Sequence, residues 1–121
     1  MITAVHPTQM SYSQASLVVT PSQFLFISGQ VPADGDNRVP ADFDAQCRLV
    51  WSNIETQLAA AGMGLSNLVK VTTFLSDRQY RSINARIRHE ILSGHAPALT
   101  VIIAGIYEPE WLLEIEAIAA R

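Results

Sequence analysis

The chain has 121 residues, 49% of them apolar and 16% charged, and its formal net charge is −3. This length allows one domain with a single core and excludes two domains of ordinary size. The acidic balance disfavours a general nucleic-acid-binding protein, which normally carries a basic surface. Because the charged fraction lies below the usual value of about 25%, either the surface is unusually apolar or another copy of the chain covers part of it.

The first elements predicted along the chain are two strands. Two apolar runs, at 17–20 and 24–30, flank a short break that contains Pro21 and Ser22. Such a pair of runs around a turn signal predicts a β-hairpin. Residues 32–40 are polar and rich in turn-forming side chains, so we expect a loop there.

An amphipathic helix is predicted over residues 44–61. Asp42 or Asp44 can cap its start, and Gly62 provides the left-handed conformation that commonly ends a helix. We expect Cys47 on this helix to be a buried structural thiol and Trp51 to belong to the core. Steps of three and four residues place the following side chains on one apolar face: Cys47, Val50, Trp51, Ile54, Leu58 and Ala61.

A strand and a second helix follow. Residues 68–75 form a β-branched and apolar run that predicts the strand. Ser76 or Asp77 caps the next helix, and Gly94 ends it. The apolar stripe of this helix consists of Tyr80, Ile83, Ile87 and Ile91.

Two further strands, 98–104 and 111–119, complete the predicted elements. The resulting order, ββαβαββ, predicts an α+β fold in which two helices pack on one face of a mixed sheet. Because two helices cover only one face, we expect a symmetry-related sheet to cover the second face. Both faces of strand 98–104 are mostly apolar, with Leu99, Val101 and Ile103 on one side and Thr100, Ile102 and Ala104 on the other.

Two carboxylates on the last strand are the strongest candidates for chemistry. Glu114 and Glu116 are two residues apart, so they share one face of the strand at a separation of roughly 7 Å. Leu113, Ile115 and Ala117 take the opposite, helix-packed face. Either the carboxylates reach solvent or pair with an arginine, or one of them lies in an interface cleft and activates water.

The remaining polar groups give weaker signals. His6, His89 and His95 lack the spacing of metal ligands, and we expect no metal. The chain has no glycine-rich phosphate loop, no nucleophile elbow and no Cys-x-x-Cys pair. The arginines of the second helix do not share one stripe, so we expect a solvated polar face, with a phosphate or RNA contact as the alternative; they are Arg78, Arg81, Arg86 and Arg88.

A cytoplasmic location without membrane attachment is expected. No apolar run reaches the roughly 18 residues of a membrane span, and the first residues lack the pattern of a signal peptide. The single cysteine, Cys47, excludes an internal disulfide and fits a reducing compartment.

Several short segments, taken in order, resemble the RidA/YjgF family. The resemblance implies one RidA-like domain over residues 1–121, with a fold like that of the trimeric chorismate mutases. It also implies a homotrimer with its sheets inside, its helices outside and a small-molecule cleft at each subunit boundary. The segments that carry it are Tyr12–Ala15, Ile27–Pro32, Ala61–Gly62, Val69–Leu75, Asn84, Pro97–Ala98 and Leu113–Ala119.

The resemblance further implies an activity that needs no cofactor. The best-known activity of the family is hydrolysis of reactive enamines and imines to a 2-keto acid and ammonia. By this resemblance Tyr12 lies at the cleft mouth, and Ser28 and Gly29 line its floor. Asn84 supports the wall, and Glu114 holds or activates the attacking water. An imine carbon is already electrophilic, so a positioned water and a carboxylate suffice.

The chain departs from the family pattern at Leu99, where active imine hydrolases carry an arginine that clamps the substrate carboxylate. Two residues further on, Val101 replaces a cysteine or similar small residue. A bidentate arginine–carboxylate contact is strong and specific, whereas leucine makes the pocket apolar. We therefore expect a deaminase of the enamine/imine type that is not a standard 2-imino-acid hydrolase. The alternatives are a non-catalytic module that binds a small ligand and, more weakly, a ribonuclease or translation inhibitor.

Overall fold

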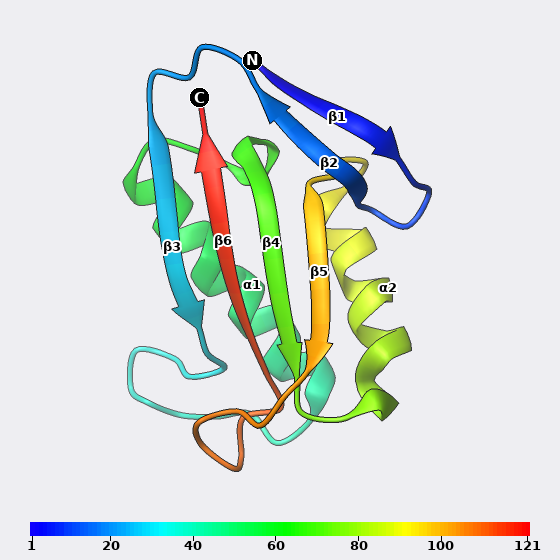
Figure 1. Cartoon of the computed structure of the whole chain (residues 1–121). Coiled ribbons are helices and arrows are strands. Elements are labelled where there is room, and N and C mark those ends of the chain that lie inside the picture. The colour runs from blue at the N-terminus through cyan, green and yellow to red at the C-terminus, as the bar shows by residue number, and fades with distance from the viewer.

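Six strands form one mixed sheet, in the order β1-β2-β5-β4-β6-β3 (Figure 1). The computed structural model describes residues 1–121. Strands β2 and β4 each run parallel to β5, and the other neighbouring pairs are antiparallel. This arrangement confirms the predicted α+β fold with a mixed sheet and two helices. The strands are β1 Ile2–Pro7, β2 Ser13–Val18, β3 Phe24–Gln30, β4 Leu68–Leu75, β5 Ala98–Ile103 and β6 Leu113–Ala120, and the helices are α1 Phe43–Ala60 and α2 Arg81–Leu92.

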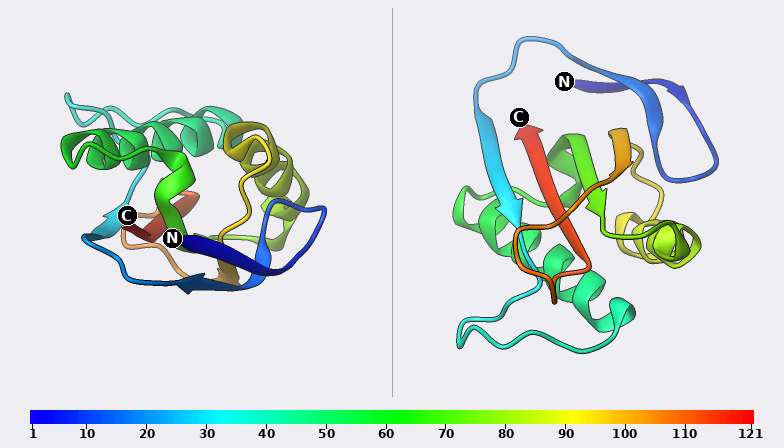
Figure 2. Two further views of the ribbon diagram at one scale, coloured as in Figure 1. Left: turned by 90° about the horizontal axis from the view of Figure 1, so that it is seen from above. Right: turned by 60° about the horizontal axis from the view of Figure 1, so that its bottom comes forward.

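Both helices lie on the same side of the sheet (Figures 1 and 2). Helix α1 begins where the side chain of Asp42 accepts a hydrogen bond from the Ala45 amide at 3.2 Å, and Gly62 adopts the left-handed conformation just beyond its end. The predicted burial of Cys47 and Trp51 is confirmed, since they are 0% and 1% exposed. The core between helices and sheet is built mainly from Val50, Trp51, Ile54 and Leu58 of α1, Ile87 of α2, Val71 and Leu75 of β4, and Leu113, Ile115 and Ala119 of β6.

The predicted hairpin between residues 17–20 and 24–30 is wrong. Strand β2 pairs with β1 and touches β5, whereas β3 pairs with β6. The cause is that Leu25 and Ile27 of β3 gain burial against α1 and the core by adding to β6, a gain that pairing with the projecting β2 would not provide. The order is therefore βββαβαββ, because the N-terminal segment forms the additional strand β1, an exposed edge of mixed polar and apolar residues that gave no clear sequence signal.

The second helix starts and ends slightly differently from the prediction. The Asp77 side chain accepts from the Gln79 amide at 2.8 Å and caps a short 3₁₀ turn, Arg78–Tyr80, that precedes α2. At the other end Ser93, rather than Gly94 alone, takes a left-handed conformation, with a φ of 47°. The predicted apolar stripe is confirmed, because Ile87 is fully buried and Tyr80, Ile83 and Ile91 pack against the core.

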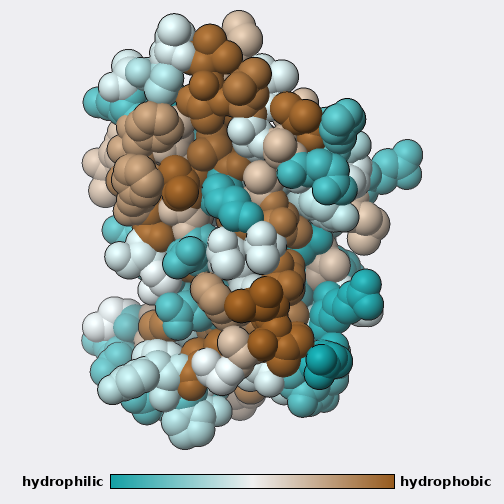
Figure 3. All heavy atoms as spheres, in the orientation of Figure 1, coloured by the Kyte–Doolittle hydropathy of each residue, from teal (hydrophilic) through white to brown (hydrophobic).

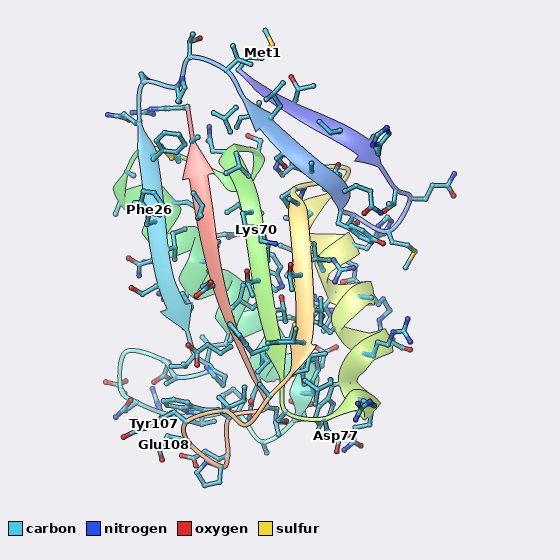
Figure 4. All side chains as sticks on the ribbon, in the orientation of Figure 1. Met1, Phe26, Lys70, Asp77, Tyr107 and Glu108 are labelled. Carbon is cyan, nitrogen blue, oxygen red and sulfur yellow. The ribbon has the colours of Figure 1, made fainter.

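The opposite face of the sheet has no covering layer within the chain, as the sequence predicted. Phe24, Phe26 and Ile102 are 52%, 72% and 44% exposed on it, and Figure 3 shows the apolar surface that such side chains create. The apolar surface is interrupted where Lys70 of β4 donates a hydrogen bond to the hydroxyl of Thr100 on β5 at 2.6 Å (Figure 4). We call the face of the sheet opposite the helices the open face. In addition, neither helix is long and apolar enough to cross a membrane.

Candidate functional site

A pocket of about 720 Å³ lies between α2, β5 and the segment that leads into β2. Strand β5 has a free edge there, because its only partner on that side is Ser13 of β2, opposite Ala98. The inward-pointing side chains of β5 therefore face α2 across an open channel. The lining residues are Met10, Tyr12, Leu75, Arg78, Arg81, Asn84, Ala85, Arg88, Leu99, Val101 and Ile103.

Four of the predicted site residues meet in this pocket: Tyr12, Asn84, Leu99 and Val101. Asn84 is 2% exposed, and its Oδ1 lies 3.8 Å from the Cys47 Sγ, so its position on the pocket wall is fixed by the core. Burial raises the pKa of the Cys47 thiol to about 12, which keeps this sulfur protonated and inert. Cys47 thus supports the wall and supplies no nucleophile.

A tight turn just before β2 forms the rim of the pocket and presents Tyr12. The Thr8 hydroxyl donates to the Tyr12 carbonyl at 2.9 Å, and Ser11 is held in a left-handed conformation, with a φ of 63°. The turn is tied to α2 by two side chains. The Ser11 hydroxyl contacts Nδ1 of His89 at 2.5 Å, and Arg88 donates to the Met10 carbonyl at 3.0 Å. Helix α2 therefore positions the rim as well as one wall.

The expected solvated face is confirmed for Arg78, Arg81 and Arg86, which are exposed, but it is wrong for Arg88, which is buried. Arg78, Arg81 and Arg88 all line the pocket, and Arg88 is only 5% exposed. Burial lowers the pKa of Arg88 from its ordinary value. Arg86 is the member that points elsewhere, with its Nη2 3.8 Å from Asp44 of α1. Sequence reasoning missed this because it treated the four as one set, although Arg81 and Arg88 are two helical turns apart and so share a face.

The other three predicted residues, Ser28, Gly29 and Glu114, gather at the β3–β6 edge. The register between these strands shifts between Ile27 and Gln30, which leaves one extra residue on β3. Glu114 lies on the open face, and its carboxylate occupies the space where a Cβ on Gly29 would stand. Only glycine therefore allows this close approach.

The carboxylates of Glu114 and Glu116 both lie on the open face, as predicted from their spacing. Their strand neighbours on β4 are Phe74 and Thr72 respectively. Neither glutamate takes part in any of the ion pairs of the chain. Glu114 is half-buried and Glu116 exposed. Glu114 is therefore the better placed of the two to act on a bound molecule.

The predicted site residues form two groups, the pocket group (Tyr12, Asn84, Leu99 and Val101) and the β3–β6 group (Ser28, Gly29 and Glu114). One chain does not bring these two groups together. Leu99 and Val101 line the helix side of β5, whereas Glu114 lies on the open face of β6, with β4 between the two strands. The pocket group lies in a concave cavity whose lining includes arginines, whereas the β3–β6 group supplies a carboxylate. No cluster of three His, Cys, Asp or Glu side chains is arranged to hold a metal ion.

Comparison with known proteins gives matches over nearly the whole chain. The family model described as Endoribonuclease L-PSP matches residues 2–121. A RutC family protein from Pyrococcus horikoshii is 36% identical over 112 residues, which cover 91% of this chain and 86% of the relative. The Escherichia coli protein TdcF, whose name assigns it provisionally as a reactive intermediate deaminase, is 30% identical over 102 residues, 80% of this chain and 78% of its own.

Solved structures share the fold. The protein YyfB of the Rid family from Yersinia pestis, described as of unknown function, superposes with a TM-score of 0.86 at 23% sequence identity. The superposition covers 99% of this chain and 98% of that one. At this level of identity the likeness concerns the fold alone.

Proposed function

The chain belongs to the RidA/YjgF family, which the Endoribonuclease L-PSP model describes, and we propose that it is a cofactor-free hydrolytic deaminase acting on a small enamine or imine. The observation that carries the proposal is the Glu114 carboxylate held over Gly29 without an ion-pair partner. A half-buried carboxylate free of other partners is suited to general base catalysis.

The proposed reaction needs only water and this carboxylate. Glu114 accepts a proton from water as the water oxygen adds to the carbon of the C=N bond. This proton passes to the nitrogen to give a carbinolamine. Glu114 then accepts the proton of the new hydroxyl group as the C=O bond forms, and delivers it to the nitrogen as the C–N bond breaks, so that ammonia and a carbonyl product leave. An enamine enters the same route once its carbon is protonated to give the imine. Because the imine carbon is electrophilic at the start, positioning of water supplies much of the rate increase.

The site is proposed to be completed by a second subunit of a homotrimer. A cyclic trimer joins two unlike surfaces of the chain, head to tail. The pocket group and the β3–β6 group lie on unlike edges, so this symmetry can bring Glu114 and Gly29 of one subunit to the pocket of the next. The exposed Phe26 and Ile102 supply apolar area for such an assembly. A mass of three chains by light scattering at micromolar concentration is expected, and a monomer would contradict it.

The cytoplasmic location expected from the sequence stays a prediction.

The substrate is proposed to differ from that of a standard 2-imino-acid hydrolase. Leu99 and Val101 make the β5 wall of the pocket apolar, so no charge on this strand can hold a substrate carboxylate. A substrate either lacks that group or places it against another part of the pocket.

The activity is tested by ammonia release from a panel of enamines and imines with and without a carboxylate. Glu114→Gln is expected to lower the rate above the uncatalysed hydrolysis by about 10²–10⁴-fold, the usual contribution of a general base. Glu116→Gln is the matched control, since it removes the neighbouring carboxylate on the same face of the same strand. Equal rates for Glu114→Gln and the native chain, or no release from any substrate, would overturn the proposal.

A second candidate function is a binding module that does no chemistry. The apolar β5 wall favours it, because a pocket of this size with few polar groups on one side suits capture of a partly apolar ligand. A ligand that raises the melting temperature of the protein but is not turned over would support this function over the deaminase.

A further inference from the structure

Arg88 is a buried cation without an anionic partner. It is 5% exposed, and none of the ion pairs of the chain includes it. Its Nη2 donates to the Met10 carbonyl at 3.0 Å, whereas its Nε has no hydrogen-bond partner. A guanidinium carries five N–H donors, and burying it unpaired is costly. The position is thus set up for an anion that the chain itself does not contain.

The surroundings of Arg88 define what that anion can be. None of the pocket-lining residues is acidic, and two further arginines, Arg78 and Arg81, stand along the same wall. Neither of these takes part in an ion pair. The facing wall of β5 is apolar. The pocket therefore combines a strongly positive side with an apolar side, which fits a small molecule that has one anionic end and an apolar body.

We propose that Arg88 of α2 binds the carboxylate of the ligand, from the wall opposite Leu99. This inference rests on the proposed function, since it names the substrate class of the same site: small acids with an apolar body. A carboxylate held from α2 points its apolar part toward β5, where Leu99 and Val101 contact it. Where the family pattern has an arginine on β5, this chain has Leu99, and its cation lies instead on the facing helix.

A purely structural role for Arg88 is the competing explanation, because its bond to Met10 holds the rim turn. The two roles differ in one measurable quantity, the ratio of affinities for a carboxylate ligand and its neutral amide. Displacement of the rim lowers the affinity for both ligands alike, whereas loss of the charge contact lowers only the affinity for the carboxylate. The probes are 4-methyl-2-oxopentanoate, its amide and inorganic phosphate, titrated by calorimetry into the full-length protein.

The native protein is expected to bind the keto acid about 10–100-fold more tightly than the amide, the range of a charge-assisted hydrogen bond. It is also expected to bind the keto acid more tightly than phosphate. Arg88→Gln should bring the keto acid to amide ratio close to one. The matched control is Arg86→Gln, on the same helix but outside the pocket, and its ratio should equal that of the native chain.

A second pair of variants keeps Arg88 in place, in case its removal unfolds the chain. Ala85 lines the pocket three residues before Arg88 on the same helix. Ala85→Glu should pair with Arg88 and reduce keto acid binding at least about tenfold while amide binding persists, and the isosteric Ala85→Gln should reduce both ligands equally. An unchanged ratio in Arg88→Gln and Ala85→Glu, tighter binding of phosphate, or no preference in the native chain would each overturn the inference.

The measurement separates this inference from the proposed function, because binding requires no turnover. A charge-dependent ratio with no ammonia release supports Arg88 as the anion site and rejects the deaminase. Glu114-dependent ammonia release with an unchanged ratio in Arg88→Gln supports the deaminase and rejects the anion site.

Discussion

The two parts of the proposed site lie on different strands, one along the free part of β5 and the other at the β3–β6 edge of the sheet. At the β5–α2 edge there is a pocket with an apolar wall and a positive wall, but no acid. At the β3–β6 edge there is a carboxylate packed over Gly29 that takes part in no ion pair. Binding needs the first set of properties and proton transfer needs the second. In the proposed trimer each site would therefore take the pocket from one subunit and the carboxylate from the next.

The largest expected effect comes from disturbing the β3–β6 edge alone. Gly29→Ala introduces a methyl group into the space of the Glu114 carboxylate, which must then move. We expect ammonia release to fall about 10²–10⁴-fold, as for loss of the general base. Gly35→Ala is the control, because a Cβ at Gly35 meets no atom within 4 Å. Activity retained in Gly29→Ala would show that Glu114 does not need its present position.

A second variant tests whether the two edges come together. Phe26 is 72% exposed on the open face, and Phe26→Ser removes apolar area that an assembly would bury. Burial of one such side chain contributes about 1.5–3 kcal/mol, so we expect the dissociation constant of the trimer to rise about 10–100-fold per contact. Analytical ultracentrifugation measures this. Tyr107→Ser, in an exposed loop, should leave the assembly unchanged.

A third variant changes the charge of the pocket edge. Leu99→Arg adds a cation to the apolar wall, facing Arg88. If the rest of the cleft is competent, we expect kcat/KM for 2-imino acids to rise about tenfold, within the range of one charged hydrogen bond. Leu99→Met, which keeps the volume and the apolar character, serves as the control. A folded Leu99→Arg trimer without any gain would mean that the cleft has diverged beyond this residue.

The smallest effect concerns the support behind the pocket wall. Burial raises the pKa of Cys47 from an ordinary value of 9.0 to about 12. Between these two values the unfolded chain loses a proton that the folded chain keeps, so the free energy of unfolding decreases as the pH rises. From pH 8 to pH 10 we expect this thiol to lower stability by about 1 kcal/mol. Urea denaturation at both values measures the decrease, and Cys47→Ala should lack this part of it.

The elements with a clear period were predictable from the sequence. The strand at 68–75 and the apolar stripe of α1 follow from spacing alone, because one face of each is buried. The hairpin was not predictable in this way. A local turn signal at Pro21 and Ser22 competes with distant partners, and only the whole sheet shows that β3 gains more by pairing with β6.

The candidate site likewise contains features that could be predicted from the sequence and features that could not. The shared face of Glu114 and Glu116 follows from the two-residue period of a strand. The place of Arg88 does not follow from any period, because it depends on the free edge of β5 and on the turn before β2, which accepts its hydrogen bond at Met10. Contacts between segments so far apart in the chain have no local signature, and residue type alone made Arg88 look like a solvent-exposed charge.

The close packing of the Glu114 carboxylate against Gly29 has a consequence for the history of such chains. The residues at positions 29 and 114 cannot vary independently, since any side chain at position 29 displaces the acid at position 114. A lineage that abandons the acid is released from the need for glycine, whereas one that keeps the acid is bound to it. A residue other than glycine at this position therefore indicates, in a related sequence, that no carboxylate occupies this place.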